Sequence, residues 1–146
     1  MRFESRALSN TRKTVALALA GLFVSGCSSY QAADTGLKSG HQVYTETCSV
    51  CHAEGVNNAP RYADKAAWAK LLEEGQVILS AHGWVGMGGM PPQGGNPNLT
   101  LQEFSRAVTH MARGAGADWQ DPDAAMLQEI QQEILLRRKE LAGKPR

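Results

Sequence analysis

The chain has 146 residues, of which 42% are hydrophobic and 20% are charged, and its formal net charge is +1 at pH 7. Because basic and acidic residues are nearly balanced, the composition lacks the basic surplus that marks nucleic-acid-binding proteins. Once an N-terminal leader is removed, about 120 residues remain, which is enough for one small domain with a limited core.

The N-terminus has the pattern of an export signal. An apolar run from Val15 to Val24, too short to cross a bilayer, follows four basic residues: Arg2, Arg6, Arg12 and Lys13. We therefore predict that residues 1–26 are a signal peptide. Its removal takes away four basic and one acidic side chain and leaves a slightly acidic chain.

The apolar run ends in Val-Ser-Gly-Cys at residues 24–27, which resembles the lipobox of bacterial lipoproteins. The alternative is an ordinary signal peptide with a cysteine nearby. The resemblance implies that Cys27 carries acyl chains, and that Ser28, which is not the aspartate that tends to retain lipoproteins in the inner membrane, favours the outer membrane. Each buried methylene contributes about 0.8 kcal/mol, so two or three chains make a lasting anchor. Residues 27–36 are then a flexible tether of small and polar residues.

A short amphipathic helix is predicted from Leu37 to Thr47. Leu37, Gly40 and Val43 lie on one face, at three-residue steps. Gly40 has two interpretations: a bare Cα over which another helix approaches closely, or an incidental glycine at a helix start.

Residues 48–52 read Cys-Ser-Val-Cys-His and carry the strongest signal in the chain. Two cysteines at this spacing lie about one helical turn apart, so both sulfurs can bind the two vinyl groups of one porphyrin. His52 is then held over the iron as an axial ligand. We predict one covalently bound haem c, attached at Cys48 and Cys51 and ligated by His52.

Two cysteines at this spacing also have two other interpretations. A thioredoxin-type dithiol follows a strand in a βαβ unit, and no strand-rich segment precedes Cys48. A zinc site normally needs four ligands, and the remaining histidines, His41, His82 and His110, are scattered. With Cys27 assigned to lipid, no cysteine remains for a disulfide. Haem is attached outside the cytoplasmic membrane in bacteria, so the export signal and the haem motif support each other.

The segment after His52 has a turn-forming composition. Pro60 is either a plain turn proline or the residue whose carbonyl accepts the Nδ1 proton of His52, a bond that fixes the ring and raises its basicity. Asp64 is predicted to cap a helix from Lys65 to Glu74 that stops at Gly75. A second short helix is predicted from Gln76 to His82.

Residues 83–97 form a segment too rich in glycine and proline for a regular element, and we predict a loop there. Wrapping over a haem face, with one sulfur bonded to iron, would order such a loop. Met90 is the better ligand because Pro91 and Pro92 fix the backbone after it. Met87 is the competing ligand, and His82 a third alternative.

The C-terminal part contains two predicted helices. Thr100 and Glu103 form a capping box that starts a helix ending near Met111 or Arg113. Asp121 as N-cap and Pro122 at the first helical position open another helix of about 20 residues. Its apolar stripe consists of Met126, Leu127, Ile130, Ile134 and Leu141. The stripe packs on the domain itself or, alternatively, on a second copy or a docking partner. The basic end of this helix is a candidate for contact with anionic lipid.

Residues 40–113 resemble the class I c-type cytochromes, most closely the small bacterial c5 type. The resemblance rests on the Cys-Ser-Val-Cys-His motif, Ala59-Pro60, Ala66-Ala67-Trp68-Ala69, Met90-Pro91-Pro92, residues 94–97 (Gly-Gly-Asn-Pro) and residues 107–111 (Ala-Val-Thr-His-Met). The chain lacks the extra cysteine pair that some c5 proteins carry after the methionine.

The resemblance implies an all-α class I cytochrome c fold, with about four short helices around one covalent haem, here followed by an extra C-terminal helix. It implies domains at 1–26 (signal peptide), 27–36 (tether), 37–113 (cytochrome) and 114–146 (extension). It favours the Pro60 carbonyl as the acceptor of the His52 Nδ1 proton, and it favours the Met90 sulfur as the second axial ligand of the iron. It also implies that Trp68, otherwise ordinary core, donates to a haem propionate with help from Arg61.

With His52 and Met90 filling both axial positions, oxygen and peroxide cannot bind without breaking a bond, and electron transfer remains. The expected protein is a periplasmic, membrane-tethered mono-haem electron carrier that serves redox protein partners and is not an enzyme. Three alternatives are an electron-accepting subunit of one oxidoreductase complex, a ligand sensor or peroxidase with a labile methionine, and a haem-free dithiol or zinc protein.

Overall fold

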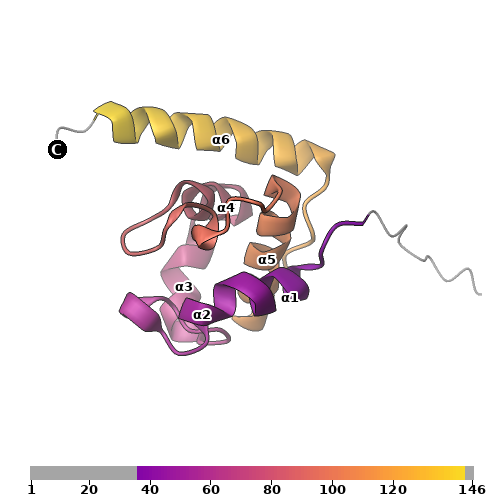
Figure 1. The fold of residues 1–146 in the computed structure, drawn as a ribbon, viewed down its shortest axis with the longest axis vertical. Coiled ribbons are helices and arrows are strands. Elements are labelled where there is room, and N and C mark those ends of the chain that lie inside the picture. Colours follow the sequence, from indigo (N-terminus) through magenta and orange to yellow (C-terminus); the bar gives the residue numbers. More distant parts are fainter. Residues whose placement is uncertain (1–35, 144–146) are drawn as a thin grey trace, which may run out of the picture. The chain divides into compact units, whose positions relative to one another are not determined.

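The structure is a computed structural model that describes residues 36–143; the predicted signal peptide, Cys27 and nearly all of the tether lie outside this range. Within the range every regular element is helical (Figure 1). The elements are α1 (Gly40–Val43), the π-helical turn η1 (Tyr44–Cys48), α2 (Ser49–His52), the 3-10 turn η2 (Val56–Asn58), α3 (Lys65–Glu73), α4 (Gln76–Val85), the 3-10 turn η3 (Pro92–Gly95), α5 (Leu101–Gly114) and α6 (Ala124–Gly143). The predicted all-α class is confirmed. In this part of the chain no helix has the length and apolarity to cross a membrane.

Side-chain caps begin α3 and α5 at the predicted residues. The Asp64 carboxylate accepts hydrogen bonds from the N–H groups of Ala66 and Ala67, each at 3.1 Å. Thr100 and Glu103 form the reciprocal pair, because each side chain accepts from the other residue's backbone N–H, at 3.2 and 3.0 Å. These bonds satisfy donors that the first helical turn leaves without a partner.

The helix that carries the cysteine motif begins later and ends later than predicted. It starts at Gly40 rather than Leu37, since Ser39 and Gln42 form a capping box with N–H to oxygen distances of 2.8 and 3.2 Å. Because α1, η1 and α2 follow one another without a gap, residues 40–52 form one helical segment. The segment carries both cysteines and His52.

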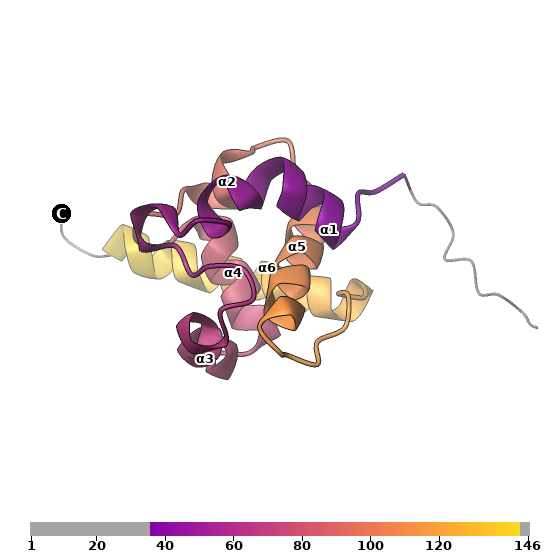
Figure 2. The same cartoon turned by 90° about the horizontal axis from the view of Figure 1, so that it is seen from below.

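Gly40 lies where α1 crosses α5. A Cβ added there would be 2.2 Å from the carbonyl oxygen of Arg106 and 3.1 Å from the Cβ of His110. Figures 1 and 2 both show α1 against α5. The close approach of two helices over a bare Cα, one of two interpretations of Gly40, is therefore confirmed.

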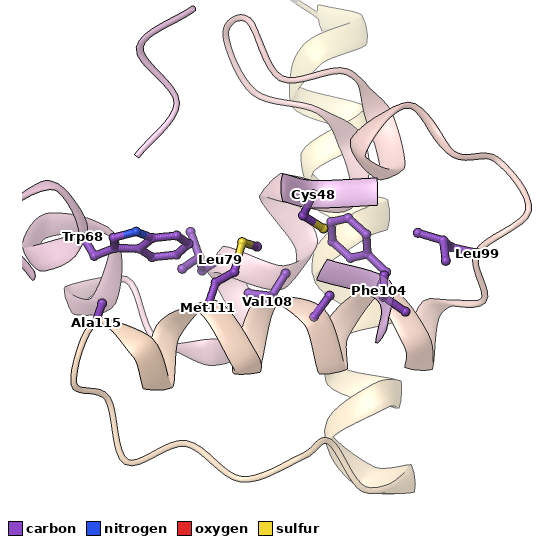
Figure 3. Packing of buried hydrophobic residues seen from close by; sticks show 10 residues of the cluster. Cys48, Trp68, Leu79, Leu99, Phe104, Val108, Met111 and Ala115 are labelled. Atoms are coloured by element: carbon purple, nitrogen blue, oxygen red, sulfur yellow. The ribbon is translucent and has the colours of Figure 1, made fainter. Parts of the chain in front are cut away.

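The main core lies along one face of α5. Phe104, Val108 and Met111 project from this face and are at most 4% exposed. Figure 3 shows how they meet residues of other elements, among them Cys48, Trp68, Leu79 and Leu99. Fully burying a side chain of this size contributes about 1.5–3 kcal/mol, which makes α5 the element on which the others pack.

Helix α4 runs to Val85, so the predicted helix end at His82 and the predicted loop start at Gly83 were wrong. Trp84 and Val85 pack against the second core cluster, which includes Ile130 and Ile134 of α6. This burial extends α4 through Gly83 although glycine disfavours a helix.

Helix α6 begins at Ala124, and the prediction that Asp121 caps it was wrong. The carboxylate of Asp123 accepts instead from the N–H of Met126 at 2.8 Å. Asp121 forms an ion pair with Arg113 at 2.9 Å. An arginine 8 residues earlier thus determines where the carboxylate of Asp121 lies.

The apolar stripe of α6 packs on the domain itself, as expected. Ile130 and Ile134 are fully buried, and Met126 and Leu127 pack beside them. Leu141 is an exception, because it is 42% exposed. Figure 1 shows α6 lying over α4.

Four aromatic rings cluster beside the crossing of α1 and α5; they belong to His41, Tyr44, Tyr62 and His110. His110 stacks on Tyr62 with ring centroids 5.3 Å apart and lies 5.2 Å from His41. Burial, followed by the nearby His41 and Arg113, lowers the pKa of His110 below its ordinary value of 6.5, against a smaller opposing effect of Asp121.

We expect Gly40→Ala to destabilise the protein by about 3 kcal/mol, because its Cβ would overlap the Arg106 carbonyl and overpacking costs about 1–3 kcal/mol or more. Urea unfolding of the haem-loaded protein measures the loss. Gly143→Ala is the control, since a Cβ there meets no atom within 4 Å. A Gly40→Ala variant as stable as the wild type would contradict the close crossing.

The lowered pKa of His110 predicts a pH dependence of stability. The pKa of His110 is lower in the folded protein than in the unfolded chain, where it is about 6.5. As the pH falls through this value, the unfolded chain binds the proton first, so protonation favours unfolding. The stabilising contribution is present above this pH and is lost below it. We expect His110→Gln to lose less unfolding free energy than the wild type between about pH 7.5 and 5.5. Equal losses in urea titrations at the two pH values would exclude His110 as the cause.

Candidate haem site

One cavity of about 710 Å³ lies between the cysteine-bearing helix, α3, α4, the loop after α4 and α5. Its volume is within the usual range for sites that bind cofactors. Among the apolar residues that line it are Trp68, Leu71, Leu79, Val108 and Met111. Figure 3 shows several of these side chains gathered over α5. Such walls suit a flat, largely apolar group.

Both predicted attachment cysteines line this cavity. Cys48 is 5% exposed and Cys51 is half-buried. Burial, followed by the proximity of Cys51, raises the pKa of the free Cys48 thiol to about 11, so this thiol stays neutral at physiological pH. An uncharged sulfur within an apolar wall is compatible with a thioether. Attachment at these two residues stays a prediction that the geometry supports.

His52 ends α2 and is buried against the same cavity, with an exposed fraction of 7%. Its Nδ1 lies 2.8 Å from the carbonyl oxygen of Pro60, so the bond that the sequence suggested is present. When Nδ1–H donates to this carbonyl, Nε2 keeps a free lone pair for a metal. The N–H of Tyr62 donates to the His52 carbonyl at 2.7 Å and ties the following loop to the ligand.

Two methionines enter the cavity from one tight hairpin. Met87 and Met90 exchange backbone hydrogen bonds of 3.1 and 2.9 Å around Gly88 and Gly89. Both methionines line the cavity, and Met90 also packs against the main core. A Cβ added at Gly83 of α4 would lie 3.7 Å from the Cε of Met90. The choice of Met90 over Met87 as the sulfur ligand stays a prediction.

Trp68 and Arg61 line the cavity, but their polar groups bond within the chain. The indole N–H of Trp68 donates to the carbonyl oxygen of Arg61 at 2.8 Å. The guanidinium of Arg61 lies 3.4 Å from the Ala53 carbonyl and 3.6 Å from the Glu54 carboxylate. The indole proton that was expected to reach a haem propionate is therefore already used, and the ring is what Trp68 offers the cavity.

His82, considered as an alternative ligand, is not among the cavity-lining residues, and its Nδ1 lies 2.9 Å from the Glu74 carboxylate. Within residues 36–143 no group of three or more histidine, cysteine and acidic side chains could hold a metal ion. The described residues therefore offer no zinc site.

Gly83 is a site residue that sequence reasoning missed. It is buried in α4, and an added Cβ would lie 3.1 Å from the ring of Phe104. The available signal was a glycine next to the tryptophan Trp84, and in the structure it marks a place where α4 packs closely on Phe104 beside Met90.

The cavity fits a haem held by this chain's own residues. Its donors are two thiols one helical turn apart, an imidazole oriented by a carbonyl, and a thioether sulfur from the hairpin. This donor set, in an apolar cavity between helices, defines the class of proteins that bind haem covalently.

Comparisons with known proteins agree with this assignment. Residues 35–111 match the family described as "Cytochrome C oxidase, cbb3-type, subunit III". Cytochrome c-555 of Chlorobaculum tepidum is 39% identical over 103 residues, which cover 67% of this chain and 91% of that protein. Cytochrome c5 of Azotobacter vinelandii is 33% identical over 79 residues, which cover 53% of this chain and 95% of that protein.

A solved structure also matches. The cytochrome in a crystal structure described as an electron transfer complex of nitrite reductase with cytochrome c is 41% identical, with a TM-score of 0.51. The match covers 54% of this chain and 98% of that cytochrome. The predicted class I cytochrome c fold is confirmed.

The chain belongs to the class I c-type cytochromes. Its cofactor is a covalently bound haem c with iron, and its role is electron transfer rather than enzymatic turnover. The interpretation as a haem-free dithiol or zinc protein is thereby excluded.

Proposed function

We propose that this protein is a periplasmic, membrane-tethered carrier of single electrons, with haem attached at Cys48 and Cys51 and iron ligated by His52 and Met90. The observation that carries the proposal is that His52 and the methionine hairpin line the same cavity as the two thiols, while Pro60 orients the imidazole. When bound, the haem supplies a one-electron couple between ferric and ferrous iron.

The chain's own residues account for the restriction to electron transfer. The Pro60 carbonyl orients the His52 ring through Nδ1 and leaves Nε2 free, and His52 and a sulfur from the hairpin, which line the same cavity, would hold the iron. With both axial positions taken, exogenous molecules would bind only when one of the two bonds breaks, and the thioether would raise the potential relative to a second histidine.

Export and anchoring rest on the N-terminal sequence. The basic segment, the short apolar run and Cys27 support a lipoprotein signal, and covalent attachment of haem takes place outside the cytoplasmic membrane. Residues 27–36 would then tether the domain to a membrane, with Ser28 favouring the outer one.

A second candidate is a cytochrome that works as the electron-accepting subunit of one oxidoreductase complex. The family match carries the description of an oxidase subunit, and the similar solved cytochrome was crystallised in an electron transfer complex with nitrite reductase. Stable co-purification with a single enzyme would favour this candidate over a free carrier.

The sulfur ligand is tested by comparing Met90→Ala with Met87→Ala. The sulfur-to-iron charge-transfer band at the red end of the ferric spectrum should be lost only in Met90→Ala, because only that sulfur is bonded to iron. Met87→Ala is the matched control from the same hairpin. Absence of the band in the wild type, together with rapid CO binding, would favour a ligand sensor or peroxidase.

The anchor is tested with Cys27→Ser in cells that mature c-type cytochromes. We expect the wild type in the membrane fraction and the variant in the soluble periplasmic fraction, because the acyl chains are lost. Labelled palmitate should enter only the wild type. A variant that stays with the membrane would show that another part of the chain holds it there.

A further inference from the structure

The C-terminal extension, residues 115–143, follows the part of the chain that matches the family, which ends at residue 111. It consists of a connector, residues 115–123, and α6. We propose that this extension clamps α4 at both ends and thereby keeps the Met90 sulfur on the iron. The inference rests on the proposed function in one respect, namely that Met90 is the sulfur ligand.

The connector holds the beginning of α4. Gln76, the first residue of α4, donates from Nε2 to the carbonyl oxygen of Gln120 at 2.7 Å and to the hydroxyl of Thr109 at 2.9 Å. One side chain therefore joins α4 to the connector and to α5.

The connector is itself held to α5. The Nε of Arg113 donates to the Trp119 carbonyl at 2.6 Å, and its Nη1 pairs with Asp121 at 2.9 Å. Pro122 is buried. Since the connector is fixed to α5, its bond to Gln76 fixes the start of α4.

Helix α6 covers the other end of α4. Ile130 and Ile134, both fully buried, form a cluster with Ala81 of α4, and Trp84 and Val85 pack against it. Trp84 also meets Phe104 of the main core edge to face, with ring centroids 5.5 Å apart. Trp84 thus packs against both the α6 cluster and the main core, so displacing α6 removes one of the two supports of this ring.

The end of α4 is coupled closely to the methionine hairpin. Gly86 follows Val85 directly, at a φ of +96°, and its N–H donates to the carbonyl oxygen of His82 at 2.9 Å. A Cβ on Gly86 would lie 3.0 Å from the Met90 carbonyl and 2.9 Å from the Pro92 nitrogen. Backbone atoms at the end of the hairpin and just after it therefore lie close to Gly86, the residue that follows α4, so a shift of α4 moves Met90.

Opening of the methionine loop is a local unfolding event, whose frequency depends on how firmly its supports are packed. Without the extension, an apolar face of α4 would be exposed, and its last turn would lose the contacts that extend the helix to Val85. The sulfur would then leave the iron more often. An external ligand that binds only the open form reports this population directly, because its apparent affinity is proportional to the open fraction.

The test uses imidazole binding to the ferric, haem-loaded protein, followed by the loss of the charge-transfer band. We expect Ile134→Ala and Ile130→Ala to bind imidazole about tenfold more tightly than the wild type, a change that corresponds to roughly 1.4 kcal/mol. Ile134→Val should give a smaller change in the same direction, and it serves if the alanine variants fail to fold.

Two controls separate a clamp from general destabilisation. Leu135→Ala and Leu136→Ala alter side chains of the same helix that are 51% and 57% exposed, and they should leave imidazole binding unchanged. Val43→Ala removes side-chain volume at a fully buried position. Val43 neither lines the haem cavity nor belongs to the cluster around Ile130 and Ile134. It should lower the urea midpoint without a comparable change in imidazole affinity.

The outcomes distinguish the two proposals. A wild type without the charge-transfer band overturns the sulfur ligation of the proposed function, and the clamp with it. If the band is present, the clamp alone is overturned when the Ile130 and Ile134 variants bind imidazole like the wild type. It is also overturned when Val43→Ala, at equal loss of stability, raises the affinity as much as they do.

Discussion

The contact between Gly40 and the Arg106 carbonyl positions the rest of the site. Because nothing but hydrogen stands on the Gly40 Cα, the helical segment 40–52 lies directly on α5. That contact places Cys48 in the main core, while Val108 and Met111 of α5 form the wall of the cavity. A wider spacing between the two helices would separate the attachment residues from the walls that enclose the cofactor. The close crossing therefore determines both the core and the geometry of the haem site.

Features set by short stretches of sequence were predicted well. The cysteine motif and the caps at Asp64 and Thr100 each act through residues close by in the sequence, so their residue types are informative by themselves. Gly40 is different, because its contact is with the distant Arg106, and the sequence left it with two interpretations. The bond from His52 to Pro60 spans 8 residues, and the resemblance to the family, rather than the residue type alone, favoured it over a plain turn proline. Local chemistry and this resemblance together were enough to predict most of the site's framework.

The errors arose where distant residues decide the local structure. The end of α4 depends on α6, about 50 residues later in the chain. Asp121 has the residue type of a helix cap, but Arg113 draws its carboxylate elsewhere. Trp68 by itself fitted ordinary core, and only the resemblance implied a bond to a propionate; in the structure its N–H donates to the Arg61 carbonyl, whose position depends on the path of a turn. Which partner each of these groups contacts can be recognised only in the folded structure, because the competing partners are separated in the sequence.

Val50 lies between the two cysteines that we propose as attachment points, yet it is 73% exposed and is not among the residues that line the cavity. Val50 therefore contributes little to packing, although it adjoins Cys51. Its polarity can vary without cost to the fold, while any charge placed there would act on an approaching partner at close range. Encounter rates and partner preference can thus diverge among cytochromes that share the same scaffold and the same iron ligands.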